Sequence, residues 1–454
     1  MSYKLPPQVL KLFKIFQKAN FEIYAVGGSV RDLIMNRPTK NWDFTTDATP
    51  EEMLRLFPDA FYDNQFGTVG IKQDNGEIYE VTTFRTEKDY TDRRHPDKIT
   101  WGKTLEEDLA RRDFTIGAIA LRLAPLAQGK LLFIDPYRGQ DDIKAKLVRA
   151  VGRPQQRFQE DALRLLRAVR IATELEYLIE PKTFQAIIDN SQLIKEISGE
   201  RIRDELLKIL ITNHPDDGFM LLKNSGLLQQ ILPEVEKGFG VDQVSPGRHH
   251  IYDVGTHSFM SLKFCPSDDA IVRLATLLHD VGKPAVFKKD DQGLITFYNH
   301  ELISASIARN IGNRLHLSKK QLDKLVTLVR WHQFTVDERQ TDSAIRRFIR
   351  RVGKENLKDI LDLRVGDRLG GGARETSWRL EEFKKRLIVV QQQPFTVADL
   401  KVDGHDVMKI LDIPPGPRVG QILTILFNEV IENEKPNERV YLLKRVEEIG
   451  KTLL

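Results

Sequence analysis

The sequence predicts an α+β fold, in which an N-terminal head with a mixed β-sheet precedes a long helical body. Two observations predict it. Strand-like segments rich in β-branched and aromatic residues are confined to about the first 145 residues. From Gln155 onward, apolar residues instead recur at spacings of three and four, which is the pattern of amphipathic helices.

Composition limits the class of protein. The 454 residues suffice for about two to four domains. The sequence contains no apolar run near the ~18 residues that a membrane span needs, and MSYKLPPQVLKLFK lacks the features of a signal peptide. We therefore expect a cytoplasmic protein with no membrane partner. The single cysteine, Cys265, excludes an internal disulfide and a cysteine zinc cage, so a metal site must use His, Asp and Glu.

The charge balance is mildly basic, because 69 Lys and Arg oppose 65 Asp and Glu, a net charge of +4. Such a balance permits a polyanionic partner without requiring one. Four arginines are clustered on one expected helix, at positions 346, 347, 350 and 351. They are candidates for phosphate contact, and the alternative is an ordinary solvated helix face.

In the head, four segments read as strands: FEIYAVGG, TVGIK, IYEVTTF and KLLFIDP. The first runs into Gly27-Gly28 and then into a helix. The free backbone N–H groups at the start of a helix suit a phosphate, although a glycine pair after a strand also serves as a plain turn. Arg31 and Asp32 in the first helical turn, and then Asp43 and Glu80, favour the phosphate site.

Glu80 shares one face of its strand with Ile78 and Thr82, so its carboxylate can reach an Asp43 carried by a neighbouring strand. Acids placed in this way can hold two divalent ions about 4 Å apart, the arrangement that promotes phosphoryl transfer. The head is thus predicted to transfer a nucleotidyl group.

The body contains helical periodicity in five segments: EDALRLLRAVRIATEL (160–175), RIRDELLKIL (201–210), FMLLKNSGLLQQIL (219–232), AIVRLATLLHDV (270–281) and LDKLVTLVRW (322–331). Glycine and proline predict breaks at 245–250, 366–375 and 412–420. Within the first segment, Asp161, Arg164 and Arg167 are three residues apart and are expected on one helix face, where they could meet a base edge and phosphates. Without the head motifs, ordinary intrahelical ion pairs would be the preferred explanation of this spacing.

Six segments resemble the consecutive motifs of class II tRNA nucleotidyltransferases, the CCA-adding enzymes and their bacterial poly(A) polymerase relatives. They are GGSVRD, WDFTTDATPEE, EVTTFR, EEDLARRDFTIGAIA, FIDPYRGQDD and RFQEDALRLLRAVRIA, in the family's order over residues 24–172. The resemblance implies four regions. These are a nucleotidyltransferase head (1–145), a helical neck that recognises the base (146–245), an HD domain (246–372) and a helical RNA-binding tail (373–454).

The resemblance also implies residue roles. Asp43 would ligate Mg²⁺ together with Asn41 and Glu80 as the catalytic set. Asp161 and Arg164 would read the Watson–Crick edge of CTP or ATP. The other implied nucleotide-binding residues are Gly28, Arg31, Arg112, Asp113, Arg167 and Arg170. The sequence departs from the family pattern at Asn41, where an Asp is usual, and at Gly117, where an Asn is usual.

The implied activity is template-independent addition of CMP, CMP and AMP to the 3′ end of tRNA, with CTP, ATP and tRNA as partners and no DNA. Poly(A) polymerase and partial CC- or A-adding activities are alternatives within the family. The segment at 90–110, where the family carries a specificity-switching loop, argues against a CC-only enzyme. A further alternative is a phosphohydrolase or a non-catalytic RNA-binding protein.

A second constellation lies in the body. The adjacent His279-Asp280 in LATLLHDVGKP resembles the signature of HD-type phosphohydrolases. The order in which the other candidate ligands follow also resembles that of metal-binding HD domains; these are His257, His300, His332 and Asp367. Such ligands suit a second divalent transition metal that activates water. The alternative is a tRNA-binding scaffold without a working metal site.

Overall fold

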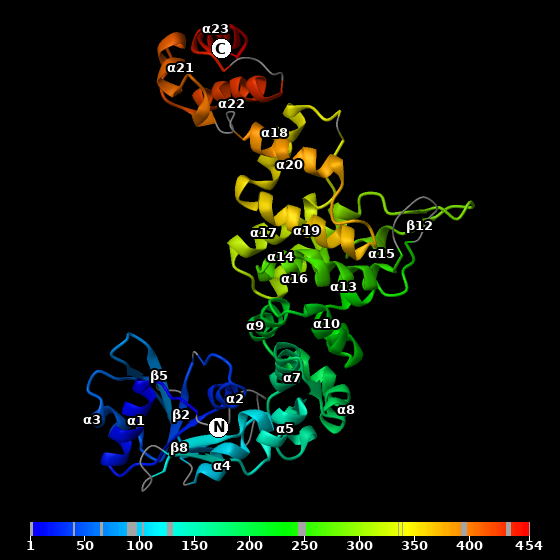
Figure 1. Cartoon of the computed structure of the whole chain (residues 1–454). Helices are drawn as coiled ribbons and strands as arrows, with labels where there is room; N and C mark the ends of the chain where they lie inside the picture. Colours follow the sequence, from blue (N-terminus) through cyan, green and yellow to red (C-terminus); the bar gives the residue numbers. More distant parts are fainter. Residues whose placement is uncertain are drawn as a thin grey trace. The chain divides into compact units, whose positions relative to one another are not determined.

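The computed structural model describes residues 3–453 except 40, 64–66, 89–97, 102–103, 125–129, 244–250, 335, 338, 392–396 and 433–436. The chain divides into two compact units, Met1–Glu236 and Lys237–Leu454. The first contains the α+β head and a set of helices, and the second is almost wholly helical (Figure 1). The predicted fold class, a mixed sheet followed by helical regions, is confirmed.

The head is built on a seven-stranded sheet of order β3-β4-β5-β2-β1-β8-β9. Only β2 and β5 run parallel; the other neighbours are antiparallel. The strands are β1 (Ile23–Val26), β2 (Asp43–Thr46), β3 (Phe61–Asp63), β4 (Thr68–Lys72), β5 (Ile78–Thr83), β8 (Ala120–Leu123) and β9 (Leu131–Ile134). The four segments predicted as strands all contain one. A separate two-stranded antiparallel sheet pairs β6 (Arg85–Lys88) with β7 (Lys98–Trp101).

The sheet is covered by helices with clear apolar stripes. In α1 (Pro7–Lys18), Val9, Leu12, Phe13 and Phe16 recur at three- and four-residue spacing and are all buried. Phe13 meets Phe44 of β2 edge to face, with ring centroids 5.9 Å apart. The remaining head helices are α2 (Gly28–Ile34), α3 (Pro50–Leu56), α4 (Leu105–Ala110) and α5 (Gly139–Ala145).

The helices that complete the first unit are α6 (Pro154–Glu160), α7 (Leu163–Leu175), α8 (Pro181–Asn190), α9 (Gly199–Leu210), α10 (Pro215–Asn224), α11 (Leu227–Ile231) and α12 (Pro233–Glu236). The expectation of one helix over 160–175 is wrong. The chain is extended at Asp161, with φ −140° and ψ 105°, between α6 and α7. The Asp161 carboxylate accepts the Leu163 N–H at 3.0 Å, a local hydrogen bond that competes with the helical one. Asp161 therefore lies at a break between two helices.

In the second unit, α13 (Val254–Phe264) packs against α19 (Leu357–Gly370) at very close range. A Cβ on Gly366 would lie 2.6 Å from the Ser261 carbonyl oxygen, and one on Gly370 would lie 2.5 Å from the Ser261 nitrogen. The glycines expected to interrupt the chain at 366–375 are therefore partly inside a helix, where they permit close approach. The interruption begins only after Gly370.

The other helices of this unit are α14 (Ala270–Leu278), α15 (Lys283–Val286), α16 (His300–Arg314), α17 (Lys319–Trp331), α18 (Asp342–Val352), α20 (Trp378–Val390), α21 (Gly404–Leu411), α22 (Pro417–Glu432) and α23 (Arg439–Leu453). The predicted break at 412–420 is present between α21 and α22, whereas the one at 245–250 lies outside the described residues. The last three helices share a core that includes Val407, Leu426 and Val446. Among the described residues, no helix combines the length and apolarity needed to cross a membrane.

Candidate functional site

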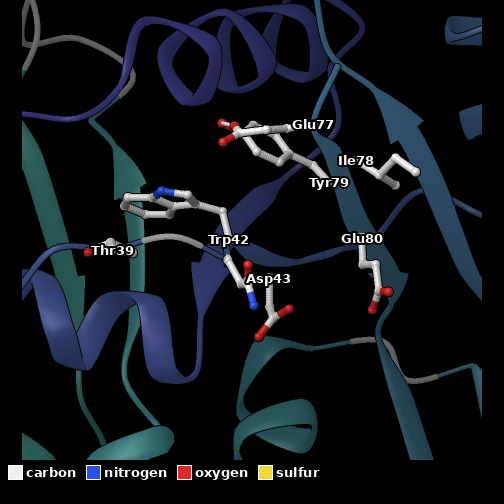
Figure 2. A pocket seen from close by; sticks show the side chains of 8 residues that line it. Thr39, Trp42, Asp43, Glu77, Ile78, Tyr79 and Glu80 are labelled. Atoms are coloured by element: carbon white, nitrogen blue, oxygen red, sulfur yellow. Dashed lines mark hydrogen bonds between the residues drawn. The ribbon is translucent and has the colours of Figure 1, made fainter. Parts of the chain in front are cut away.

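The predicted catalytic acids meet at the junction of β2 and β5. Asp43 and Glu80 are direct partners in the parallel register of these strands. Their carboxylates project toward the same side, away from the rings of Trp42 and Tyr79 (Figure 2). With Asn41, they line one pocket of about 660 Å³. Two carboxylates and an amide oxygen are hard oxygen donors, so this set fits a divalent ion such as Mg²⁺.

Gly27, between β1 and α2, leaves room for two charged side chains, those of Arg112 and Asp43. It has a φ of 76°, and a Cβ at this position would lie 3.3 Å from Arg112 Nη1 and 3.5 Å from Asp43 Oδ2. Loss of solvent raises the pKa of Asp43; Arg112 opposes this rise and Glu80 adds to it. Asp43 is thus held between a cation that attracts it and an acid that repels it.

The arginines predicted to bind the nucleotide are held in place by acids. Arg112 Nη2 donates to Asp108 Oδ2 at 3.1 Å, and Arg111 Nη2 donates to the other oxygen at 2.6 Å. Burial alone would raise the pKa of Asp108, but the two arginines lower it. In α2, Arg31 pairs with Asp32 at 2.8 Å, close to Gly28. Asp108 was missed at the sequence level, although its spacing of three and four from two arginines was a usable signal.

Asp113 and Arg167 join the head to α7. Arg167 Nε donates to Asp113 Oδ2 at 2.7 Å, and the Phe114 N–H donates to the other oxygen. Burial opposes ionisation of Asp113, but Arg167 and Arg164 lower its pKa. These two predicted nucleotide-binding residues therefore bind each other.

The two predicted base-reading residues lie on either side of the break between α6 and α7. Arg164 is buried, and its Nη1 donates to Glu160 Oε2 at 2.7 Å and to the Arg157 carbonyl at 3.1 Å. Its Nη2 donates to the Arg111 carbonyl at 3.1 Å. Glu160 therefore orients Arg164. Among the residues that the structure describes, these contacts account for three of the five guanidinium N–H donors.

Arg170 and the arginines of α18 have mainly structural contacts. Arg170 Nε donates to the buried Glu205 of α9 at 2.6 Å, and its Nη1 pairs with Glu174. Arg346 is buried. By contrast, Arg351 is exposed and lies over the Trp331 ring, 5.0 Å from its centroid.

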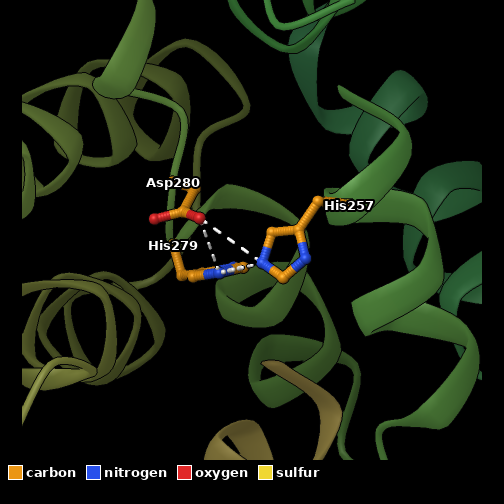
Figure 3. A group of neighbouring side chains, drawn as sticks. All are labelled: His257, His279 and Asp280. Atoms are coloured by element: carbon orange, nitrogen blue, oxygen red, sulfur yellow. Dashed lines mark hydrogen bonds and ion pairs between the residues drawn. The ribbon is translucent and has the colours of Figure 1, made fainter. Parts of the chain in front are cut away.

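In the second unit, all six predicted metal ligands converge, and Figure 3 shows three of them. Asp280 Oδ2 lies 3.2 Å from His279 Nε2 and 3.4 Å from His257 Nε2. Asp280 Oδ1 lies 3.2 Å from His300 Nε2 and 3.6 Å from His332 Nε2. Asp367 Oδ1 lies 3.3 Å from His257 Nε2. Asp280 thus joins two overlapping ligand sets through its two oxygens.

The imidazoles are oriented as metal ligands require. The Nδ1 atoms of His279, His300 and His332 lie 2.7–2.9 Å from the carbonyl oxygens of Thr276, Phe297 and Val329. A carbonyl only accepts, so each Nδ1 carries the proton and donates it. Each Nε2 then points a lone pair into the cluster when the ring is neutral.

The charges of this cluster are strongly coupled. Burial lowers the pKa of His279, but Asp280 and Asp367 outweigh that effect and raise it to about 10. Burial likewise opposes ionisation of Asp280 and Asp367, yet the neighbouring cations hold both carboxyl pKa values well below the usual range. Burial lowers the pKa of His332. A proton on His279 therefore partly neutralises the two carboxylates.

Lys283 was missed at the sequence level. Its ammonium lies 2.6 Å from Asp280 Oδ2 and donates to Gln243 Oε1 at 2.8 Å, and both side chains are buried. The signal was its position three residues after Asp280. Gln243 had no such signal, because it comes from a distant part of the chain.

Three protein families match the chain. The Poly A polymerase head domain matches residues 23–149, the probable RNA and SrmB-binding site of polymerase A matches 176–239, and the putative tRNA nucleotidyltransferase domain 2 matches 293–446. The chain is also similar to a CCA-adding enzyme of Lactobacillus helveticus, with 44% identity over 232 residues. That alignment covers 50% of this chain and 56% of the relative.

Other relatives match over nearly their whole length. The CCA-adding enzymes of Lactobacillus johnsonii and Limosilactobacillus reuteri are 31% and 32% identical, and the alignments cover 93% and 96% of this chain and 92% and 94% of the relatives. Among solved structures, the Bacillus stearothermophilus CCA-adding enzyme in complex with CTP is 26% identical, with a TM-score of 0.71 over 99% of this chain and 100% of that one. The Thermotoga maritima CCA-adding enzyme complexed with tRNA, at 19% identity and a TM-score of 0.60 over 97% and 95% of the two chains, shares the fold.

Proposed function

The chain belongs to the family of CCA-adding enzymes, and from this premise we propose that it adds CMP, CMP and AMP to the 3′ end of tRNA. CTP and ATP are the donors, and pyrophosphate leaves. The observation that carries the proposal is the register pairing of Asp43 with Glu80 beside Arg112. We expect this chemistry to take place in the cytoplasm, on tRNA and not on DNA.

The head residues have distinct tasks. Asp43, Glu80 and Asn41 would hold Mg²⁺, which supplies charge neutralisation for the transferred phosphate when it is bound. Arg31 and Arg112 carry the positive charge that receives the triphosphate, and the start of α2 at Gly28 brings backbone N–H groups close to it. On nucleotide binding, Asp113 and Arg167 exchange part of their mutual contact for the ribose and triphosphate.

Base selection follows from hydrogen-bond chemistry. Cytosine and adenine each present an exocyclic amino donor next to a ring-nitrogen acceptor on the Watson–Crick edge. The Asp161 carboxylate accepts from the amino group, and Arg164 donates to the ring nitrogen. Uracil and guanine present the reverse order, so both are rejected. A protein surface thus takes the place of a nucleic-acid template.

Nucleotide addition tests this function directly. Purified protein would be incubated with tRNA that lacks its 3′-terminal CCA and with each labelled nucleotide in turn. We expect two C additions from CTP alone and one terminal A when ATP is also present. Long A-tails made without CTP would instead indicate a poly(A) polymerase, and C addition without A would indicate a partial enzyme.

A second function is favoured by the buried cluster of six ligands. We infer that this cluster forms an HD-type site that binds a divalent transition metal and hydrolyses a phosphoester. The support is the convergence of four imidazoles and two carboxylates on common points, with three imidazoles oriented by backbone carbonyls. The metal would supply an activated water when bound. The protein residues around the ligands would orient the imidazoles and balance the charge of the two carboxylates.

The two activities can be separated by mutation. Asp280→Asn should abolish both bound Mn²⁺ or Ni²⁺, measured by elemental analysis, and hydrolysis of bis(p-nitrophenyl) phosphate, while CCA addition persists. His405→Ala, an exposed histidine of the same unit, is the control. Wild-type protein that retains no metal after loading would leave this unit as an RNA-binding scaffold.

A further inference from the structure

An exposed aromatic ring lies in line with the two predicted catalytic acids. Phe61 of β3 pairs with Gly70 of β4, and Gly70 pairs with Glu80 of β5. Glu80 in turn pairs with Asp43 of β2. Residues directly opposite each other on paired strands point to the same face of a sheet. Phe61, Glu80 and Asp43 therefore form one row across the sheet, on the face that carries the acids.

Gly70 lets the Phe61 ring lie against the sheet and reach toward Glu80. A Cβ on Gly70 would lie 2.3 Å from Cζ of Phe61 and 2.6 Å from its Cε1, so the far end of the ring occupies the space above Gly70. The ring is therefore one strand spacing, about 5 Å, from the strand that carries Glu80. Despite its contact with Gly70, Phe61 is 47% exposed. Part of the ring is thus available to a ligand beside the acids.

The surroundings of the ring suit a single strand of RNA. Ile78, which shares a strand face with Glu80, is 51% exposed and lines the same pocket as both acids. Lys72 of β4 is exposed and is the register partner of Ile78. This face therefore combines apolar surface, which bases prefer, with a cation, which phosphates prefer.

The occupant follows from the order of the groups across the sheet. Gly27, where Arg112 and Asp43 come together, is on the β1 side of the acid pair, and Phe61 is on the β4 side. In nucleotidyl transfer, the attacking oxygen and the leaving oxygen lie roughly in line on opposite sides of the reacting phosphorus. A triphosphate received at the start of α2 therefore leaves the Phe61 side to the RNA 3′ end.

We propose that Phe61 is the stacking platform for the 3′-terminal base of the RNA acceptor, whose 3′-hydroxyl it holds beside the acids. The inference rests on the proposed nucleotide addition. The terminal base changes from step to step, because the acceptor ends first in the base that precedes the missing CCA and then in each newly added C. Stacking tolerates this change, since every base has a π-face, whereas a hydrogen-bonding site would favour one base. A fixed ring can therefore serve every addition.

An aromatic ring over a strand glycine can also stabilise the sheet alone. In that case, loss of the ring lowers the stability of the fold and leaves substrate recognition unchanged. Stacking on the acceptor has a different consequence. Loss of the ring raises the KM for tRNA but not the KM for CTP, and the rise depends on the base of the terminal nucleotide.

The experiment uses tRNA that lacks CCA, with either its normal 3′-terminal nucleotide or an abasic one that keeps the 3′-hydroxyl. For the wild type we expect the abasic tRNA to have a KM about 5- to 50-fold higher. Phe61→Leu, which still covers Gly70 but lacks a π-system, should show the higher KM with both tRNAs, which then differ by less than about twofold. Phe61→Tyr should behave as the wild type. Leu132→Ala is the control, because Leu132 is an apolar residue of β9 with a similar exposure of 43%.

Thermal unfolding shows whether each variant is folded, and Phe61→Ile takes the place of Phe61→Leu if the latter is not. A folded Phe61→Leu variant that distinguishes the two tRNAs as well as the wild type does would overturn the inference, and so would an equal rise in the KM for CTP. An active wild type that is indifferent to the terminal base would also overturn it, while the proposed function stands. A wild type that adds no nucleotide to normal tRNA would instead overturn the proposed function and the inference with it.

Discussion

At the scale of single residues, position 41 decides how strongly the head holds a metal ion. Asn41 lines the same pocket as Asp43 and Glu80, but its amide oxygen contributes no charge. Affinity for hard divalent ions rises with the number of charged ligands. The register pairing of Asp43 with Glu80 supplies the charge that Asn41 does not.

Asn41→Asp should bind Mg²⁺ or Mn²⁺ more tightly than the native protein, by about tenfold, because it adds one carboxylate to the set. Titration with Mn²⁺, followed by its paramagnetic signal, measures this without any turnover. The reciprocal change, Glu80→Gln, should weaken binding. Equal affinities in the native and Asn41→Asp proteins would show that position 41 does not face the ion.

Asp43→Ala should reduce nucleotide addition by about 10³-fold or more, since it removes the carboxylate that pairs in register with Glu80 in the metal set. Asp74→Asn is a matched control, because Asp74 is an exposed carboxylate of the same head that pairs only weakly with Lys11 at the surface. Gel analysis of tRNA elongation gives both rates. Comparable losses in the two variants would contradict a special role for Asp43.

Sequence reasoning reached Asp43 and Glu80 because strand alternation fixes which side a residue faces. It missed Asp108, Arg201 and Lys283, which hold a functional residue in place. Asp108 and Lys283 lie three or four residues from their partners, so the spacing of charged residues contained a signal for them. No such signal exists for Arg201, because only the packing of α9 on α7 brings it to Asp161.

At the scale of elements, the periodic pattern located the helices well and their interruptions poorly. Apolar spacing runs without a gap through 160–175, yet the helix breaks at Asp161 because a side-chain oxygen captures a backbone N–H. In the other direction, the glycines at 366–375 placed the break a few residues too early, because α19 continues to Gly370 and the break follows it. Both errors have one cause. The local sequence pattern does not reveal side-chain hydrogen bonds or the contacts that another helix makes.

The close packing of α13 on α19 gives a stability prediction. Gly370→Ala would place a Cβ 2.5 Å from the backbone nitrogen of Ser261, so the helices must separate. Overpacking costs about 1–3 kcal/mol and outweighs the gain of up to about 1 kcal/mol in helix propensity. Gly420→Ala is the control, because a Cβ there meets nothing within 4 Å inside α22. Urea unfolding should show Gly370→Ala less stable and Gly420→Ala slightly more stable than the native protein.

At the scale of the whole molecule, the second unit assembles its ligand cluster from five helices or their ends, α13, α14, α16, α17 and α19. The sequence predicted the ligand identities through their order. It could not predict that the two oxygens of Asp280 would each face a different pair of imidazoles, because that depends on how the helices cross.

Metal binding to this cluster should depend on pH with a definite sign. The pKa of His279 is raised from 6.5 to about 10, so its stabilising proton is fully present below pH 6.5 and is lost as pH rises through about 10. A metal must displace that proton. Between pH 6.5 and 9, stabilisation by Mn²⁺ should therefore increase with pH, while the contribution of His279 to metal-free stability falls.

Calorimetry in buffers of different ionisation enthalpy should show release of about one proton for each ion bound at pH 7. Asp280→Asn removes the shared ligand and should abolish both the heat of binding and the shift in Tm. Binding without proton release would mean that His279 is neutral in the metal-free protein.

The parallel pairing of β2 with β5 has a consequence for how the protein folds. The paired residues are 37 positions apart, and the chain between them contains β3 and β4. A slip of one residue would turn Asp43 and Glu80 to opposite faces. Long-range pairing of this kind closes slowly, whereas helices form early. On refolding, the helical circular dichroism signal should therefore recover before Mn²⁺ binding in the head. Recovery of Mn²⁺ binding then marks the point at which β2 and β5 pair in the correct register.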